Sequence, residues 1–137
     1  MFLGEYYTKF TGKGRVILPS KMREELKGVK VVVLSRGFEE CIWGFSLEDF
    51  EKEAGKQLEI SATEERARML RRYLFSASAP VELDVQGRFV IPTALLMYAR
   101  VGREIVIIGA GDHFEIWNNK FWEKHLKAIE REYARVS

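Results

Sequence analysis

The sequence predicts an α+β fold in which two similar halves pack together as one pseudo-twofold, β-barrel-like domain with peripheral helices. The first observation behind this prediction is an internal repeat: residues 14–19, Gly-Arg-Val-Ile-Leu-Pro, recur at 87–92 as Gly-Arg-Phe-Val-Ile-Pro. Three further matches follow in the same order, 30–34 with 104–108, 42–43 with 116–117 and 50–52 with 122–124. The second observation is that each half mixes short apolar runs with helix-forming stretches. We therefore divide the chain into a first repeat at 1–58, a helical connector at 59–75 and a second repeat at 76–137.

Each half is expected to contain the same elements in the same order. A first strand, at 6–10 or 80–83, precedes a turn at Gly14 or Gly87. The apolar run after each Gly-Arg pair predicts a strand buried on both faces, which Pro19 or Pro92 ends before a short helix begins. Two strands joined by a glycine turn follow, at 31–34 and 40–43 in the first half and at 105–108 and 114–117 in the second. A second helix closes each half, with Ser46 in one and Asn118 or Asn119 in the other as N-cap.

The connector is expected to be a helix rather than a flexible linker. Residues 61–64, Ser-Ala-Thr-Glu, have the spacing of a capping box, and Met69, Leu70 and Tyr73 recur on one helical face. The segment contains neither Pro nor Gly. Two halves joined by such a helix are expected to pack against each other.

Composition argues against several classes of protein. The 137 residues are 47% hydrophobic and 31% charged, with one cysteine, Cys41, and two histidines, His113 and His125. One cysteine cannot form an internal disulfide, and the two histidines lack zinc-ligand spacing. No apolar run approaches the roughly 18–20 residues of a membrane helix, and residues 1–10 do not resemble a signal peptide. We expect a cytoplasmic protein without metal, cofactor, membrane segment or small-molecule substrate.

No group of residues indicates an enzyme. Residues 12–14, Gly-Lys-Gly, match neither nucleotide-binding glycine motif and favour a turn. Cys41 stands in a predicted strand, where a buried hydrophobe is favoured over a nucleophile. His113 follows a glycine turn and is interpreted as a turn or surface residue. Glu39 and Glu40 would point to opposite faces of a strand, which does not suit paired acid and base catalysis.

The charges are unevenly placed along the chain. The formal net charge is only +2, but residues 9–36 hold eight cations and two anions, a net charge of +6. Residues 39–59 have a net charge of −5, and the window 82–109 of the second half is neutral. A local basic segment attracts phosphates or acidic partners even when the total charge nearly cancels. The first half is therefore the better candidate for binding a polyanion.

Residues 84–88, Asp-Val-Gln-Gly-Arg, predict a tight turn between two strands. The Asp84 carboxylate can accept hydrogen bonds from backbone N–H groups further along the turn, and Gly87 supplies the positive φ that closes it. The same carboxylate can hold the Arg88 guanidinium bidentately. From these residues alone, a structural salt bridge is favoured over a binding site.

These motifs resemble the MraZ family over nearly the whole chain. The resemblance rests on residues 1–6, 12–23, 72–77 and 82–92, and above all on the D-x-x-x-R pattern of Asp84 and Arg88, which is specific to that family. It implies two tandem swapped-hairpin repeats of the AbrB type and a bacterial transcriptional regulator, a repressor, of the division and cell-wall gene cluster. It also implies a nucleoid-associated, ring-shaped homo-oligomer that binds direct repeats in double-stranded promoter DNA.

The first repeat departs from the family pattern at one position, because Thr11 stands where Asp is expected. Threonine accepts a turn hydrogen bond more weakly and adds no negative charge beside Arg15, so phosphate can approach this arginine more easily. The candidate turn residues are Thr11, Gly14, Asp84 and Gly87. The candidate DNA-binding residues are Arg15, Lys13, Lys9, Lys21, Arg23 and Arg88, with Arg88 contributing less.

A second class of function stays open on the residues alone. A non-enzymatic oligomeric adaptor that binds an acidic protein partner would also use the basic segment. The salt dependence of binding to a promoter fragment, compared with random DNA, separates the two.

Overall fold

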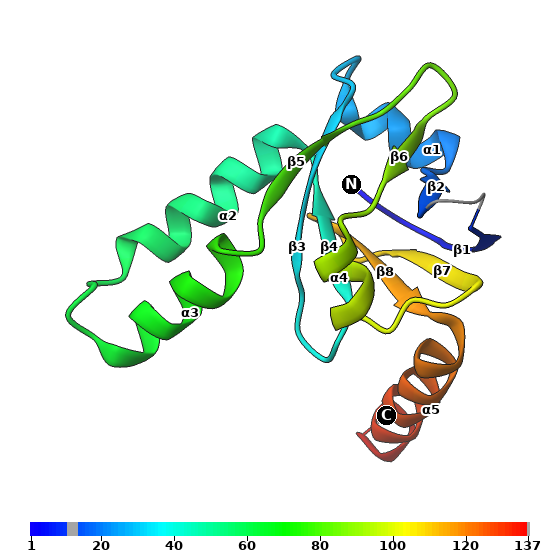
Figure 1. Ribbon diagram of the computed structural model, residues 1–137. Coiled ribbons are helices and arrows are strands. Elements are labelled where there is room, and N and C mark those ends of the chain that lie inside the picture. The colour runs from blue at the N-terminus through cyan, green and yellow to red at the C-terminus, as the bar shows by residue number, and fades with distance from the viewer. Residues whose placement is uncertain (11–13, 137) are drawn as a thin grey trace.

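The computed structural model describes residues 1–10 and 14–136 and contains one large and one small sheet (Figure 1). The six-stranded sheet has the order β1-β7-β8-β4-β3-β5. Its strands are β1 (Glu5–Lys9), β3 (Val31–Arg36), β4 (Ile42–Phe45), β5 (Ala79–Glu82), β7 (Glu104–Gly109) and β8 (Phe114–Asn118). A separate two-stranded ribbon pairs β2 (Arg15–Ile17) with β6 (Arg88–Val90). The pairs between these strands are all antiparallel.

The strand order relates the two halves by a pseudo-twofold axis. Exchanging β1 with β5, β3 with β7 and β4 with β8 gives the same strand order read from the other edge of the sheet. β1 and β5 each pair with a strand of the opposite half. Corresponding residues of the two repeats meet at the axis: Val16 pairs with Phe89 in the ribbon, and Ile42 pairs with Ile116 in the sheet. The repeat in the sequence is therefore also a repeat in the structure.

The main core lies between the sheet and the ribbon. Helix α1 (Ser20–Arg23) with the 3₁₀ turn η1 (Glu24–Leu26) follows β2, and α4 (Thr93–Tyr98) follows β6. Pro19 and Pro92 are the N-caps of these short helices. Val16 and Phe89 point inward, and they pack with side chains such as Ile107 in one buried cluster. This packing holds the ribbon as a second layer over one face of the sheet.

Two expectations about the strands are wrong. The large sheet is open rather than barrel-like, because β1 and β5 form its two edges and do not pair with each other. The strands β2 and β6 are not buried on both faces: Ile17 is 40% exposed and Val90 is 48% exposed. Their apolar side chains alternate in and out because the ribbon packs on the core through one face only.

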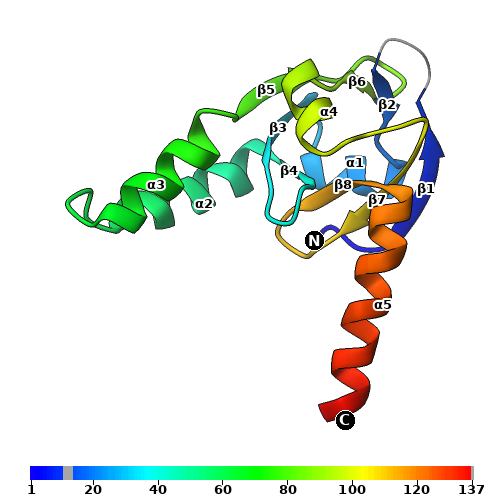
Figure 2. The same ribbon diagram turned by 60° about the horizontal axis from the view of Figure 1, so that its bottom comes forward.

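The longer helices extend from the body (Figure 2). Helices α2 (Leu47–Glu59) and α3 (Glu65–Phe75) form a projecting hairpin, and α5 (Asn119–Val136) contacts β7 and β8 before it extends away in another direction. The N-caps are as predicted, since Ser46 Oγ accepts from the Asp49 amide at 3.0 Å and Asn118 Oδ1 accepts from the Lys120 amide at 2.9 Å. Among the described helices, none is long and apolar enough to cross a membrane.

The connector is helical but begins later than predicted. The expected capping box is not formed, because the Ser61 hydroxyl accepts from the Thr63 amide at 3.3 Å and α3 begins only at Glu65. Arg71 Nη2 donates instead to the carbonyls of Leu58 and Ile60, at 3.3 and 2.5 Å, and so ties α3 to the end of α2. The connector therefore belongs to a helical hairpin together with α2.

Candidate nucleic-acid interface

The β2–β6 ribbon presents a twofold pattern of side chains on its outer face. Because side chains alternate along a strand, Arg15 and Ile17 of β2 share this face with Arg88 and Val90 of β6. The register places Arg15 opposite Val90 and Ile17 opposite Arg88. Two arginines thus occupy diagonal corners of the ribbon, and two exposed apolar side chains occupy the other corners. Arg15 and Arg88 also line one shallow cleft, together with Asp84.

The turn before β6 is organised by Asp84. Its Oδ1 accepts hydrogen bonds from the amides of Gln86 and Arg88, both at 2.9 Å, while its Oδ2 binds Arg88 Nε at 2.7 Å. The hydrogen bond from the Arg88 amide, followed by the contacts with the Arg88 side chain and the Gln86 amide, holds the pKa of Asp84 below its ordinary value of 3.8. The Arg88 guanidinium therefore binds only one of the two carboxylate oxygens and not both, as a bidentate pair would. The other oxygen accepts hydrogen bonds from backbone amides.

The two ribbon turns are joined to the opposite strands by matched hydrogen bonds. The Gly87 carbonyl accepts from the Leu18 amide at 2.9 Å, and the Gly14 carbonyl accepts from the Ile91 amide at 3.1 Å. Gly14 and Gly87 both have a positive φ, 73° and 82°, which glycine adopts without a steric penalty. The other two candidates in the first turn, Thr11 and Lys13, lie outside the described residues.

Arg23 lies against the turn of the opposite repeat. A methyl group at Gly87 would stand 2.5 Å from Arg23 Cδ and 2.7 Å from Arg23 Nε. The corresponding residue of the second repeat is Leu96, which approaches Gly14 in the same way at 3.4 Å. Arg23 Nε is buried without a hydrogen-bond partner among the described atoms. A cation of the first repeat therefore borders the turn that carries Arg88.

The remaining two candidates flank the ribbon on other elements. Lys9 is the exposed last residue of β1, opposite Glu104 of β7. Lys21 is exposed on α1, which directly follows β2. The two side chains thus lie at separate places around the ribbon, each open to solvent.

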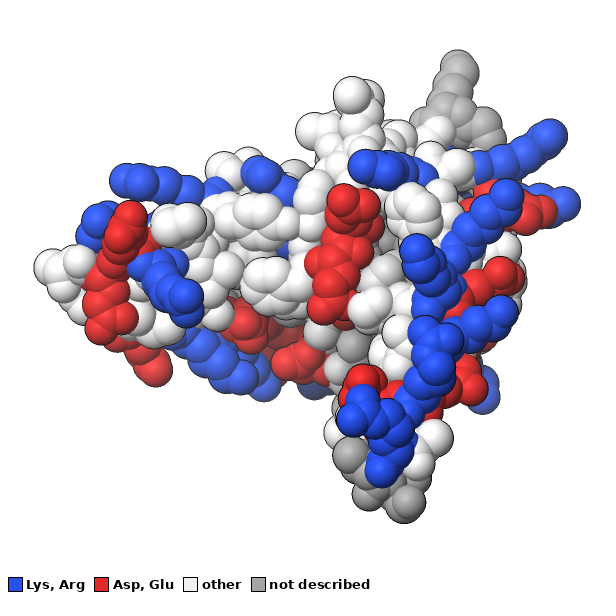
Figure 3. Space-filling model, turned by 90° about the horizontal axis from the view of Figure 1, so that it is seen from below, with Lys and Arg blue, Asp and Glu red and all other residues white. Residues whose placement is uncertain are grey.

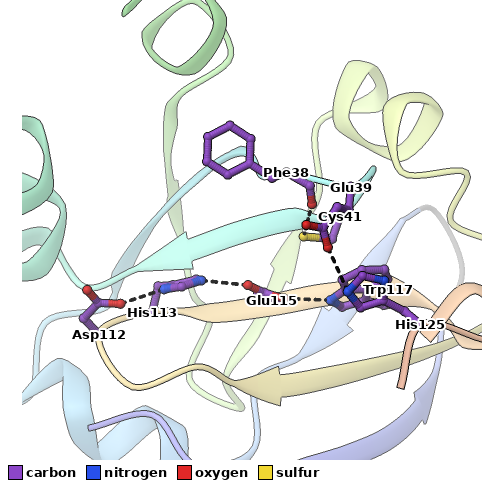
Figure 4. A network of polar contacts seen from close by, with 8 residues as sticks. All are labelled: Phe38, Glu39, Cys41, Asp112, His113, Glu115, Trp117 and His125. Carbon is purple, nitrogen blue, oxygen red and sulfur yellow. Dashed lines mark hydrogen bonds and ion pairs between the residues drawn. The ribbon is translucent and has the colours of Figure 1, made fainter. Parts of the chain in front are cut away.

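A polar network on the other side of the sheet has a structural role (Figure 4). His113 binds Asp112 through Nδ1 at 2.7 Å and Glu115 through Nε2 at 2.8 Å, and Trp117 Nε1 donates to Glu115 at 2.9 Å. Burial opposes the charged imidazole, but the hydrogen bonds and charges of Glu115 and Asp112 outweigh it and raise the pKa of His113. Burial opposes the charged carboxylate of Glu115, but its hydrogen bonds with His113 and Trp117 outweigh this and lower the pKa of Glu115. His113 lies in a turn, as expected, but its side chain is only 14% exposed and is not a surface group.

The other titratable groups of this region do not gather into a catalytic site. Glu39 and Glu40 lie in the β3–β4 turn with positive φ, not on a strand, and they contact different residues, His125 at 2.8 Å and Arg100 at 3.8 Å. Cys41 is buried as expected, and burial above all raises the pKa of its thiol, which makes it a poor nucleophile. In the described residues, no cluster of His, Cys, Asp and Glu is placed to hold a metal ion.

Two residues of the exposed ribbon face were missed by the sequence reasoning. The apolar runs that contain Ile17 and Val90 predict buried side chains at both positions. The signal that could have found them is the period of two, which puts each on the same strand face as the arginine two positions before it.

The fold and this surface define a class of protein: a duplicated α+β chain whose outer β-ribbon carries a twofold-related pair of arginines. The family described as "MraZ protein, putative antitoxin-like" matches the chain twice, at residues 1–73 and 74–135. The chain belongs to the MraZ family.

Curated relatives agree over the full length of the chain. A protein of Leifsonia xyli subsp. xyli named "Transcriptional regulator MraZ" is 44% identical over 137 residues, which cover 99% of this chain and 94% of the relative. Proteins with the same name from Paenarthrobacter aurescens and Halothermothrix orenii are 40% and 36% identical, and the matches cover 99% and 100% of this chain and 94% of each relative. The match of both halves to one family agrees with the internal duplication.

Proposed function

We propose that the protein is a sequence-specific DNA-binding regulator of transcription that reads DNA with the β2–β6 ribbon. The observation that carries this proposal is the pair of arginines, Arg15 and Arg88, on one exposed ribbon face. A two-stranded ribbon fits the width of the major groove, and arginine is the commonest side chain to bind guanine edges there. Ile17 and Val90 offer apolar contacts of the kind that thymine methyl groups accept.

The flanking cations are assigned to the phosphate backbone. Lys9, Lys21 and Arg23 surround the ribbon, and Lys13 joins them on the strength of its position in the sequence. All four belong to the first repeat, which therefore supplies most of the phosphate contact. Arg88 contributes less because Asp84 already neutralises part of its charge.

Membership of the family supports a role in the regulation of transcription. Relatives over the full length of the chain carry the name transcriptional regulator. We assign to this chain repression of the bacterial division and cell-wall gene cluster, through direct repeats in the promoter bound by a ring-shaped homo-oligomer. Such a protein acts in the cytoplasm, on the nucleoid. Its working parts are the two repeats, 1–58 and 76–137, which the connector at 59–75 joins in the chain, and catalysis has no part in its action.

Binding to the DNA immediately upstream of the protein's own gene, measured over a range of salt concentrations, tests this function. The logarithm of the affinity is expected to fall linearly with the logarithm of salt, by roughly 0.9 for each neutralised phosphate. A specific site is expected to bind about 10³-fold or more tightly than random duplex of the same length. An affinity that does not change with salt concentration would contradict DNA binding and favour the adaptor function. Equal affinity for both duplexes would leave only non-specific binding.

A further inference from the structure

Helix α5 carries a row of cations that the ribbon surface does not include. Five basic residues recur at intervals of three or four along this helix, which places them on one face. They are Lys120, Lys124, Lys127, Arg131 and Arg135. From the first to the last, the row is about 22 Å long, the length of roughly six base pairs of duplex. We call this row the α5 stripe.

The stripe is open to solvent and largely unneutralised. All five side chains are exposed. Arg135 pairs with Glu132 at 3.4 Å, but the other four form no ion pair with any residue that the structure describes. The acidic residues of α5 stand beside the row rather than in it. A solvated row of like charges is unfavourable by itself, so it is suited to a polyanionic partner.

The stripe continues toward the proposed DNA-binding surface. In Figure 3, basic side chains form a band along α5 that continues up the right-hand side of the body. The loop between α4 and β7 bridges the two regions: the Arg103 carbonyl accepts from the Phe10 amide at 3.1 Å, and the Arg100 carbonyl accepts from Asn118 Nδ2 at 2.8 Å. Arg100 also lies 6.0 Å from the centre of the Phe121 ring of α5. Cations of this loop thus lie between Lys9 at the end of β1 and the start of the stripe.

The partner that fits this arrangement is DNA rather than a membrane surface. A helix that binds a bilayer must bury its apolar face in the lipid. Trp122 and Leu126, on the apolar face of α5, instead pack in the cluster with Trp117 and Val106 of the sheet. The N-terminal half of α5 therefore exposes mainly its charged face to solvent. A charged face suits an electrostatic contact with phosphates.

We propose that the α5 stripe is a second DNA-binding surface, which holds the phosphate backbone of the duplex beside the segment that the ribbon reads. This inference rests on the proposed function, since it presupposes a duplex on the ribbon. The stripe extends the contact along the DNA without reading bases. Its contribution is therefore independent of sequence and strongly dependent on salt.

The test compares two variants that lose the same charge. The stripe variant is Lys120→Gln/Lys124→Gln/Lys127→Gln/Arg131→Gln. The control variant is Lys52→Gln/Lys56→Gln/Arg66→Gln/Arg72→Gln, four exposed cations of the α2–α3 hairpin, which projects away from α5 (Figure 2). Affinity for a random 40-base-pair duplex is measured by fluorescence anisotropy against salt, with melting temperature and oligomeric mass as checks on folding. For the stripe variant, the slope of log affinity against log salt concentration is expected to be smaller by roughly two to four, and the affinity at low salt to fall at least about tenfold. Both changes are expected to be much smaller for the control variant.

The Arg15→Ala variant separates failure of this inference from failure of the proposed function. If Arg15→Ala loses DNA binding while the stripe variant keeps the wild-type slope, the inference is overturned and the ribbon function stands. If the wild-type protein does not bind duplex at all, both are overturned. The inference also fails if the stripe variant keeps its DNA slope but loses binding to phosphatidylglycerol vesicles, because the stripe would then be a membrane surface.

A second experiment maps where α5 lies on the DNA. The native Cys41 is only 1% exposed and its thiol has a raised pKa, so an introduced surface cysteine can be labelled selectively. Lys127→Cys carrying an iron–EDTA cleavage reagent is expected to cut promoter DNA beside the segment protected by the ribbon. Lys56→Cys with the same reagent is the control and is expected to cut weakly. Equal cutting from both positions would contradict the inference.

Discussion

Arg15 and Arg88 occupy equivalent positions in the two repeats, yet their surroundings differ. Arg15 is exposed and belongs to the segment of net charge +6. Arg88 is half-buried and is bound by Asp84, which also holds the turn through its second oxygen. The first arginine is therefore the better contact for DNA, while the second also organises its own turn.

Exchange of each arginine for alanine is expected to separate these roles. Arg15→Ala should weaken promoter binding at least about tenfold and remove about one unit of salt slope per engaged subunit, with little change in melting temperature. Arg88→Ala should show the opposite balance, with a lower melting temperature as Asp84 loses its partner and a smaller loss of affinity. Affinity, melting temperature and oligomeric mass are measured on the same preparations. Loss of binding in Arg88→Ala with near wild-type binding in Arg15→Ala would refute the assignment of the first repeat as the main contact.

The stability of the fold is expected to depend on pH through His113. Its raised pKa means that the charged imidazole stabilises the fold below its ordinary pKa of 6.5 and that this stabilisation is lost as the pH rises through the raised value. Glu115, with a lowered pKa, contributes above its ordinary value of 4.5 and loses its effect as the pH falls. The His113–Glu115 pair therefore stabilises the fold most between about pH 4.5 and pH 6.5.

His113→Phe keeps an aromatic ring against Trp43 but leaves the Glu115 carboxylate without this partner. We expect it to lower the free energy of unfolding by about 2 kcal/mol near pH 6 and by less at pH 8.5. His125→Phe is the matched control, because it also replaces a histidine that contacts a carboxylate, but that carboxylate, Glu39, is 60% exposed. Thermal unfolding at both pH values measures this, and an equal loss at the two values would contradict the role of the charged imidazole.

At the scale of elements, the pairing of β4 with β8 beside the pseudo-twofold axis depends on a close approach. Gly44 pairs with Phe114, whose ring is fully buried and lies across the glycine. A methyl group at Gly44 would stand 2.1 Å from Phe114 Cζ, well inside any allowed contact. The two hairpins can therefore meet at the centre of the sheet only because this position has no side chain.

Gly44→Ala is expected to lower the free energy of unfolding by about 3 kcal/mol, because the added methyl group must displace a fully buried ring from its packing. The matched control is Gly55→Ala in α2, where an added methyl group meets nothing within 4 Å. There the better helix propensity of alanine should stabilise the protein by roughly 0.5–1 kcal/mol. Chemical unfolding of both variants measures the two changes. A Gly44→Ala variant with the wild-type free energy of unfolding would contradict the close approach of Phe114 to this glycine.

At the scale of the whole molecule, we expect a homo-oligomer well above a dimer. The projecting α2–α3 hairpin and the segment between its helices expose Leu58, Ile60 and Met69 by 57%, 41% and 60%. Several large apolar side chains exposed on one projecting element favour a contact with another protein surface. Light scattering at micromolar protein tests the assembly. A molar mass near the 15.9 kDa of the monomer would contradict the ring.

The features that depend on local chemistry can be predicted from the amino-acid sequence. The duplication, the α+β class, the Asp84 turn and the N-cap at Ser46 follow from repeats, turn residues and short spacings, which also narrow the second N-cap to Asn118 or Asn119. The signal for the α5 stripe is local as well, because its cations recur at helical intervals. The site was found only in part: the sequence indicated Arg15 and Arg88 but not the exposed partners Ile17 and Val90 beside them.

The pairing of the strands and the burial of their faces, in contrast, cannot be predicted from local sequence. β1 and β5 pair with the opposite half, the large sheet stays open, and Arg23 lies against Gly87 of the other repeat. The burial of His113 between two carboxylates cannot be predicted in this way either. The physical reason is that turn chemistry and side-chain period act over a few residues, whereas a strand's partner depends on packing between residues far apart in the chain.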